Sequence, residues 1–132
     1  MKHVLVKTSH ERHTLDGKDL ESRSYLPHDL MHFAYAEVTG SQEGFFSAGE
    51  NQMREEAIVG VLQGGYKQYV LEAGEFDASA YLSHLNKYLA TQGISGVDFS
   101  NNTLMRIFST YRTFSTRWHA LRTGESLTIE VS

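Results

Sequence analysis

The sequence predicts a single α+β domain spanning residues 1–132, in which a small antiparallel sheet is covered by about four helices. Three observations support this fold class. Strand-like segments occur only toward the two ends of the chain. The part between them carries apolar residues at the spacing of amphipathic helices. The length of 132 residues suits one domain, and no internal repeat or linker divides it.

The N-terminal part of the chain predicts three strands. Residues 3–8 form a short segment rich in β-branched side chains, which is typical of a strand. Asp16-Gly17 is a strong hairpin signal, because both residues tolerate the positive φ angles that a tight turn needs. We expect this turn to join strands at residues 10–15 and 19–25.

The first two helices follow this sheet. We expect the first at about residues 27–39, because Pro27 suits a first helical position, where its missing N–H costs nothing. Gly40 then ends the helix. We expect the second at about residues 51–72, where Gly64-Gly65 weakens the middle and predicts a bend or a break.

Two further helices are expected at about residues 78–91 and 100–122. Asp77 is placed to cap the third helix, with Phe76 and Tyr81 spaced as a hydrophobic staple around it. The fourth helix has the clearest pattern, a heptad-type seam with successive spacings of 3, 4, 3, 4 and 3 residues. The members of this seam are Leu104, Ile107, Tyr111, Phe114, Trp118 and Leu121.

A final strand is expected at the C-terminal end. Leu127, Ile129 and Val131 alternate with polar residues, which predicts a strand with one buried face. This strand can pair only with the N-terminal strands, because the sequence offers no other sheet. Both ends of the chain are therefore expected to meet in one sheet.

The composition excludes several classes of protein. The chain has no cysteine, so it has no disulfide framework, thiolate metal site or cysteine nucleophile. Its net charge of −4 argues against a nucleic-acid partner. We find neither an apolar run of about 18 residues nor a secretory leader, and we expect a cytoplasmic protein with no membrane partner.

Histidine is the unusual residue, because five of the seven fall within the first 32 positions. His28 and His32 are four residues apart, so on a helix they share a face and could ligate one divalent metal ion such as zinc. With Asp29 they resemble the H-E-x-x-H turn of zinc hydrolases, although Asp is one methylene shorter than Glu. The alternative is a structural role for both residues. His28 would then stabilise the start of the helix, and His32 would form a hydrogen bond to the sheet or to Asp29. His10 and His13 would face opposite sides of a strand, and one of them supplies a third ligand only if the hairpin brings it to this pair.

A catalytic metal also needs a third protein ligand, and Glu37 is the first candidate. At about 100° per residue, Glu37 lies about 180° from His28, within the apolar stripe of the helix. A glutamate in that position is expected either to pair with Arg23 or Arg54, or to be a functional carboxylate with a raised pKa.

One segment supports a resemblance. Residues 20–33 read Leu-Glu-Ser-Arg-Ser-Tyr-Leu-Pro-His-Asp-Leu-Met-His-Phe. This segment resembles a group of small uncharacterised bacterial proteins with an L-x-x-R-x-[FY]-L-x-H-D-L-x-H-[FY] motif. The group also carries a later glutamate, a G-F-[WF] element and a W-x-x-L-x-x-G-x-x-L pattern, matched here by Glu37, by Gly44-Phe45-Phe46 and by Trp118 to Leu127. The hairpin before Asp16-Gly17 is shorter here than in the group. The resemblance implies one fold unit and a shared role for the His-Asp-x-x-His turn, with no established activity.

Three functions are ranked from the sequence. The first is a small binding or protein-interaction module, in which the seam of the helix at residues 104–121 is either part of the core or the contact surface of a homodimer. The second is a metal-dependent or carboxylate-assisted enzyme that acts on a small substrate. Its candidate catalytic residues are His28, Asp29, His32 and Glu37. The third is a small-ligand-binding protein with an aromatic pocket near Phe45 and Phe46.

Overall fold

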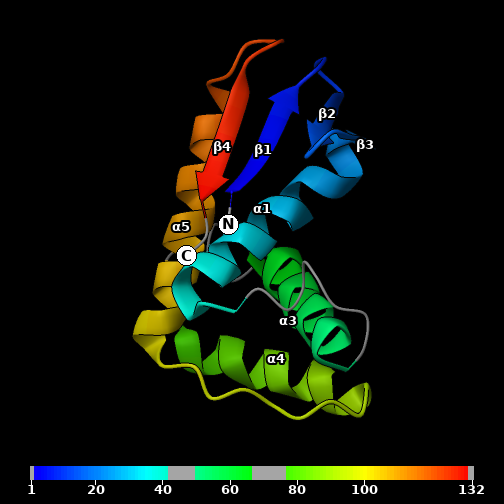
Figure 1. The fold of residues 1–132 in the computed structure, drawn as a ribbon. Coiled ribbons are helices and arrows are strands. Elements are labelled where there is room, and N and C mark those ends of the chain that lie inside the picture. Colours follow the sequence, from blue (N-terminus) through cyan, green and yellow to red (C-terminus); the bar gives the residue numbers. More distant parts are fainter. Residues whose placement is uncertain (1, 42–49, 67–76, 131–132) are drawn as a thin grey trace.

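The structure is a computed structural model, and it describes residues 2–41, 50–66 and 77–130 (Figure 1). It confirms the α+β fold class, with a four-stranded antiparallel sheet and four helices among the described residues. The strands are β1 (Lys2–Lys7), β2 (Arg12–Leu15), β3 (Lys18–Glu21) and β4 (Ser126–Glu130). The helices are α1 (Ser22–Thr39), α3 (Glu50–Tyr66), α4 (Ala78–Thr91) and α5 (Asn101–His119).

The sheet joins the two ends of the described chain. Its strand order is β3-β2-β1-β4, and every neighbouring pair is antiparallel. β1 is central, since Leu5 pairs with Leu15 of β2 and with Leu127 of β4. The predicted pairing of the final strand with the N-terminal strands is therefore confirmed. At the predicted hairpin turn, Asp16 and Gly17 have φ angles of 49° and 88°.

Helix α1 lies at the centre of the fold. It packs against α5 and α3, and it also contacts β2 and β3. Helix α4 lies far from the sheet, against α3 and α5 (Figure 1). Because neighbours surround α1, its middle is buried around the whole circumference and not along one stripe. The buried residues are Leu26, Leu30, Met31, His32, Phe33, Ala34, Tyr35 and Ala36.

The start of α1 differs from the prediction. The strand expected at residues 19–25 ends at Glu21, and the helix begins at Ser22. The reason is that the β2–β3 ladder is only four residue pairs long and ends at Glu21. Pro27 therefore lies inside the helix and not at its first position. A proline there has no N–H to donate to the carbonyl of Arg23, four residues earlier.

The second predicted helix is α3, and it continues through Gly64 and Gly65 without the predicted break. Gly65 instead allows a close approach of α4, because a Cβ at this position would lie 2.9 Å from Cε2 of Tyr81. The hydroxyl of Tyr81 donates to the carbonyl of Val61, one turn earlier on α3. Residues 67–72, which the prediction also placed in this helix, lie outside the described residues.

Helices α4 and α5 confirm the predicted elements. The side chain of Asp77 caps α4 by accepting from the amide of Ala80. The side chain of Ser100 caps α5 by accepting from the amide of Thr103. Phe76, half of the predicted staple, lies outside the described residues.

The heptad-type seam of α5 is part of the core. Leu104, Ile107, Phe114 and Trp118 are buried, and Tyr111 and Leu121 are half-buried. Helix α5 packs mainly against α1 of the same chain. A homodimer through this helix stays a prediction, and the buried seam would not be its contact surface.

Candidate metal centre

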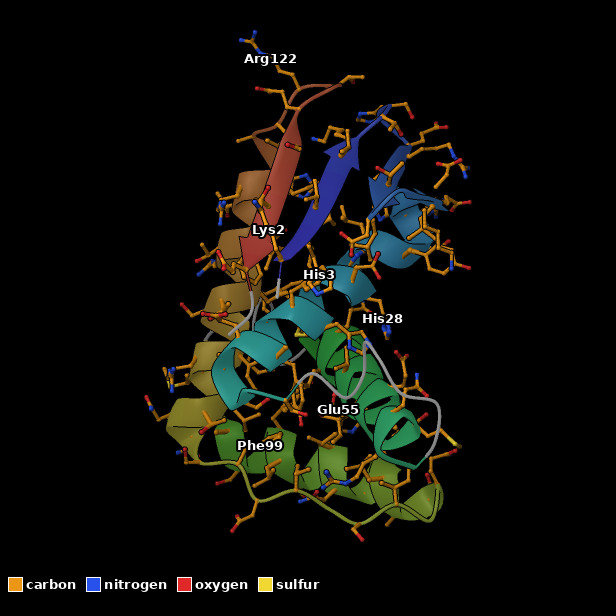
Figure 2. All side chains as sticks on the ribbon, viewed as in Figure 1. Lys2, His3, His28, Glu55, Phe99 and Arg122 are labelled. Carbon is orange, nitrogen blue, oxygen red and sulfur yellow. The ribbon has the colours of Figure 1, made fainter. Side chains whose placement is uncertain are left out.

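Two histidines of α1 face α3. His28 and His32 are one turn apart, and their Nε2 atoms are 3.1 Å from each other. Their rings meet edge to face, with centroids 4.6 Å apart. Figure 2 shows His28 where α1 passes α3. The predicted sharing of one helix face is confirmed.

Glu56 of α3 completes a three-residue cluster. Its Oε2 accepts from Nε2 of His28 at 3.0 Å, and its Oε1 accepts from Nε2 of His32 at 2.7 Å. These are the only three histidine, aspartate or glutamate side chains among the described residues whose ligand atoms converge closely enough to hold one metal ion. We call His28, His32 and Glu56 the His–Glu cluster.

The spacing within the His–Glu cluster suits one metal ion. Zinc binds imidazole nitrogen and carboxylate oxygen at about 2.0–2.1 Å, so two ligand atoms of a tetrahedral site lie about 3.3 Å apart. The nitrogen–nitrogen distance of 3.1 Å and the nitrogen–oxygen distances of 3.0 and 2.7 Å are slightly shorter than this edge. The two nitrogen–oxygen distances run to different oxygens of Glu56, so an ion bound through one of these oxygens would also need a rotation of the carboxylate.

The cluster is closed on one side and open on the other. The side chain of His32 is 6% exposed, that of His28 is 30% exposed and that of Glu56 is 40% exposed. Burial lowers the pKa of His32 below its ordinary value of 6.5, and the negative charge of Glu56 opposes this effect only in part. A neutral imidazole is the form that binds metal, so His32 is suited to be a ligand at neutral pH.

Glu37 is not part of the cluster, and the expectation of a buried glutamate at this position is wrong. Its side chain is exposed, beside a shallow groove that Arg117 and Glu130 also line. The predicted position of Glu37, about 180° around the helix from His28, is consistent with its separation from the histidines. Glu37 is exposed because it lies beyond the buried middle of α1. Neither Arg23 nor Arg54 forms an ion pair with Glu37 among the described residues.

Asp29 also points away from the cluster. Its Oδ2 accepts from Nε2 of His13 at 3.2 Å, on the side of α1 that faces β2. The hairpin therefore does not bring His13 to the predicted metal pair. His10 lines a separate cavity between the hairpin, α1 and α5.

Sequence reasoning missed Glu56. The signal available was a pair of acidic residues, Glu55 and Glu56, on a predicted helix with many other polar residues. Which of the two faces α1 depends on how α3 packs, and the structure buries Glu55 against Ser41 while directing Glu56 to the histidines. That packing has no local sequence signature.

Comparison of the chain with protein-family models, with curated proteins and with solved structures found no match. None of the described helices is long and apolar enough to cross a membrane. The resemblance to the group of bacterial proteins with the His-Asp-x-x-His turn stays a prediction.

Proposed function

We propose that this protein binds one divalent transition-metal ion, with zinc as the first choice, through the His–Glu cluster, and that the bound ion serves hydrolysis of a small substrate. The convergence of two imidazole nitrogens and one carboxylate within 3.1 Å supports this proposal. Two histidines and one glutamate are also the ligand set of several catalytic zinc sites.

The openness of the cluster favours catalysis over a structural role. Structural zinc sites have four protein ligands, whereas catalytic sites have three and leave a position for water or substrate. The exposed fractions of His28 and Glu56 leave that position facing solvent. A zinc ion held there would lower the pKa of its bound water and supply a nucleophile at neutral pH.

The residues in and near the His–Glu cluster would have different roles toward a bound ion. His32 lies in the buried part of the cluster, so its ring would bind the ion from the protein side. Glu56 supplies the negative charge that offsets part of the charge of the cation. Asp29, held by His13, is not placed to act as a general base at this site.

Isothermal titration of the metal-free protein with zinc tests the binding. We expect one ion per chain with a dissociation constant of roughly micromolar or tighter. Glu56→Gln keeps the size of the side chain but removes its charge. It should weaken binding by more than the roughly 10- to 100-fold that loss of an outer-shell partner costs.

Matched variants control for general effects of charge and histidine number. Glu37→Gln removes a carboxylate from the exposed part of α1, and His84→Ala removes an exposed histidine of α4. Both should bind zinc as the wild type does. Equal binding by Glu56→Gln and the wild type would exclude the proposed site.

Cobalt substitution tests the open position. Tetrahedral Co²⁺ absorbs visible light, and an added anion that enters its coordination sphere changes the spectrum. We expect azide to shift the spectrum of the cobalt-loaded protein. A spectrum that azide leaves unchanged would indicate a closed site and contradict the catalytic assignment.

We keep the homodimer and the cytoplasmic location as further proposals from the sequence. Light scattering over a range of concentrations tests the first of these. A mass equal to one chain at the highest concentration would exclude a stable dimer. Fractionation of cells that express the native protein tests the second.

A further inference from the structure

A second cluster lies on another face of α1. The buried side chain of His13, on β2, lies between Ser22 and Asp29 of α1. Its Nδ1 is 3.0 Å from the hydroxyl of Ser22, and its Nε2 is 3.2 Å from Oδ2 of Asp29. Its ring is also nearly perpendicular to the ring of Trp118 of α5, with centroids 5.7 Å apart.

The early start of α1 creates this arrangement. Ser22 and Asp29 are seven residues apart, so at about 100° per residue their side chains lie within about 20° of each other on the helix. Both therefore face β2 and the ring of His13. Had the helix begun at Pro27, Ser22 would not lie on this face.

The proton positions follow from the partners. A carboxylate only accepts hydrogen bonds, so Nε2 of a neutral His13 donates to Asp29. Its Nδ1 then has a lone pair and accepts from the hydroxyl of Ser22. This is the order serine, histidine, aspartate, in which a histidine can remove the proton of a serine nucleophile. In the usual triad Nε2 contacts the serine and Nδ1 contacts the aspartate, whereas in His13 these two contacts are exchanged.

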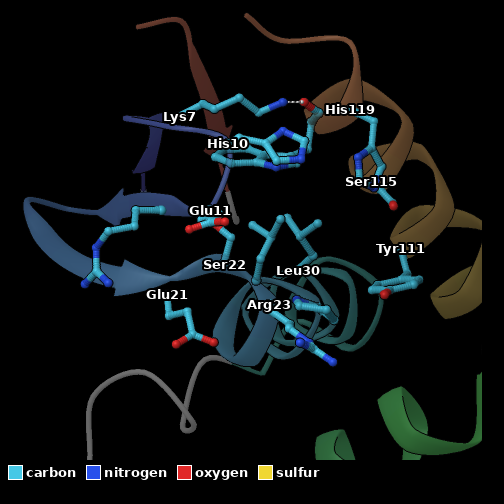
Figure 3. A pocket seen from close by; sticks show the side chains of 14 residues that line it. Lys7, His10, Glu11, Glu21, Ser22, Arg23, Leu30, Tyr111, Ser115 and His119 are labelled. Carbon is cyan, nitrogen blue, oxygen red and sulfur yellow. Dashed lines mark hydrogen bonds between the residues drawn. The ribbon is translucent and has the colours of Figure 1, made fainter. Parts of the chain in front are cut away.

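Ser22 also borders a cavity with a volume of about 760 Å³. Figure 3 shows Ser22 among the side chains around this cavity. His13 and Asp29 do not line it, so they lie behind the serine. The lining of the cavity is mixed: charged side chains such as Glu11 and Arg23 line it together with the apolar and aromatic side chains Leu26, Leu30, Tyr111 and Trp118.

The backbone at the start of α1 supplies hydrogen-bond donors next to the serine. Ser22 is the first residue of the helix, and the N-cap Glu21 makes no side-chain hydrogen bond to the amides that follow. The first amides of a helix have no acceptor within the helix, and they carry its positive end. The amide of Arg23, directly after the serine, is in the position that forms part of an oxyanion hole in serine hydrolases.

From these contacts we propose that Ser22 is the nucleophile of a serine-type esterase, with His13 as its base and Asp29 as a positioning residue. The Ser22 oxygen forms a bond to the ester carbonyl carbon while its proton passes to Nδ1 of His13. The tetrahedral intermediate then breaks the bond to the leaving oxygen, which takes that proton and departs as an alcohol. Water that takes the place left by the alcohol, within reach of Nδ1 of His13, gives a proton to that nitrogen and attacks the acyl group on Ser22; this step releases the carboxylic acid and restores the serine proton.

The cavity indicates the class of substrate. The apolar and aromatic side chains of α1 and α5 in its lining suit the acyl chain or the aromatic group of a small carboxylic ester. The reacting carbonyl would lie at Ser22, next to the amide of Arg23 in sequence. This site is independent of the His–Glu cluster, because no residue is shared and the ester chemistry needs no metal.

Hydrolysis of p-nitrophenyl butyrate by the intact chain, with EDTA present, tests the proposal. We expect Ser22→Ala to lower the rate roughly 100-fold or more. Ser24→Ala is the matched control, because it removes an exposed hydroxyl from the same helical turn, where Ser24 donates to Glu21. Its rate should equal that of the wild type. Circular dichroism and thermal unfolding establish that each variant is folded.

A fluorophosphonate probe identifies the nucleophile directly. We expect peptide mass spectrometry to find the adduct on Ser22. Asp29→Asn should lower kcat with little change in KM, because Asp29 does not line the cavity and acts through His13. The proposal is overturned by wild-type hydrolysis no faster than buffer, by equal rates for Ser22→Ala and the wild type, by loss of the activity in EDTA, or by an adduct elsewhere. Zinc titration of the same protein decides the metal site separately.

Discussion

Two neighbouring glycines of α3 should respond in opposite ways to the same substitution. A Cβ at Gly64 would meet no atom of the described residues within 4 Å, whereas a Cβ at Gly65 would lie 2.9 Å from Cε2 of Tyr81. Gly64 is exposed and Gly65 is buried. The pair therefore separates the backbone effect of alanine in a helix from the steric effect of the added methyl group.

The magnitudes follow from these two environments. Alanine is more favourable than glycine in a helix interior by about 1 kcal/mol, so Gly64→Ala should stabilise the protein by about that amount. Gly65→Ala gains the same helix stabilisation from alanine, but its methyl group overpacks the core, which costs about 1–3 kcal/mol. Tyr81 cannot move away easily, because it is fully buried, bonded to Val61 and packed against Phe108. The two variants should therefore differ by about 1–3 kcal/mol in the free energy of unfolding.

Thermal unfolding measures this difference. For a domain of this size, 1 kcal/mol shifts Tm by about 4 °C, so Gly64→Ala should unfold about 4 °C above the wild type. Gly65→Ala should unfold at or below the wild-type temperature. Combining Gly65→Ala with Tyr81→Leu should show a favourable coupling in a double-mutant cycle, because leucine lacks the ring atoms that clash. Equal gains in Tm for both glycine variants, with no coupling, would refute the close packing of α3 on α4.

Other predictions concern the cluster and a helix cap. The unfolded state binds a proton at His32 more readily than the folded state does, so the free energy of unfolding should fall as the pH drops through about 6.5 toward the lowered pKa. Urea unfolding in EDTA at several pH values measures this slope, and His32→Gln should reduce it while His84→Gln keeps it. Zinc at a hundred times its dissociation constant should stabilise the protein by about 2.7 kcal/mol, and a Tm that zinc does not raise would contradict binding to the folded state. Ser100→Ala should cost about 1 kcal/mol because α5 loses its cap, whereas Ser109→Ala within the exposed part of that helix should be nearly neutral.

The elements that sequence predicted well depend on local signals. Asp16-Gly17 turns with the positive φ angles that its residue types favour. Asp77 caps α4 through its own side chain. The seam of α5 becomes core because it offers a continuous apolar face. Each of these features is determined by residues within a few positions of one another.

The errors concern properties that depend on distant parts of the chain. The start of α1 at Ser22 depends on how long β2 can pair with β3. Glu37 has the angular position of a core residue, but the burial around α1 does not extend to it. Glu56 becomes a candidate ligand only when α3 packs against α1. The spacing of His28 and His32 therefore predicted two members of the cluster and could not identify the third.

The central place of β1 has a consequence for how the chain reaches its fold. β1 is made before the other described elements, yet one of its two neighbours is β4, which follows all four described helices. During synthesis, that edge of β1 stays without its strand partner until nearly the whole described chain has left the ribosome. Closing so long a loop is slow, and an open strand edge invites pairing between chains. Mutations that weaken β4 should therefore reduce the yield of soluble protein more than its equilibrium stability alone would suggest.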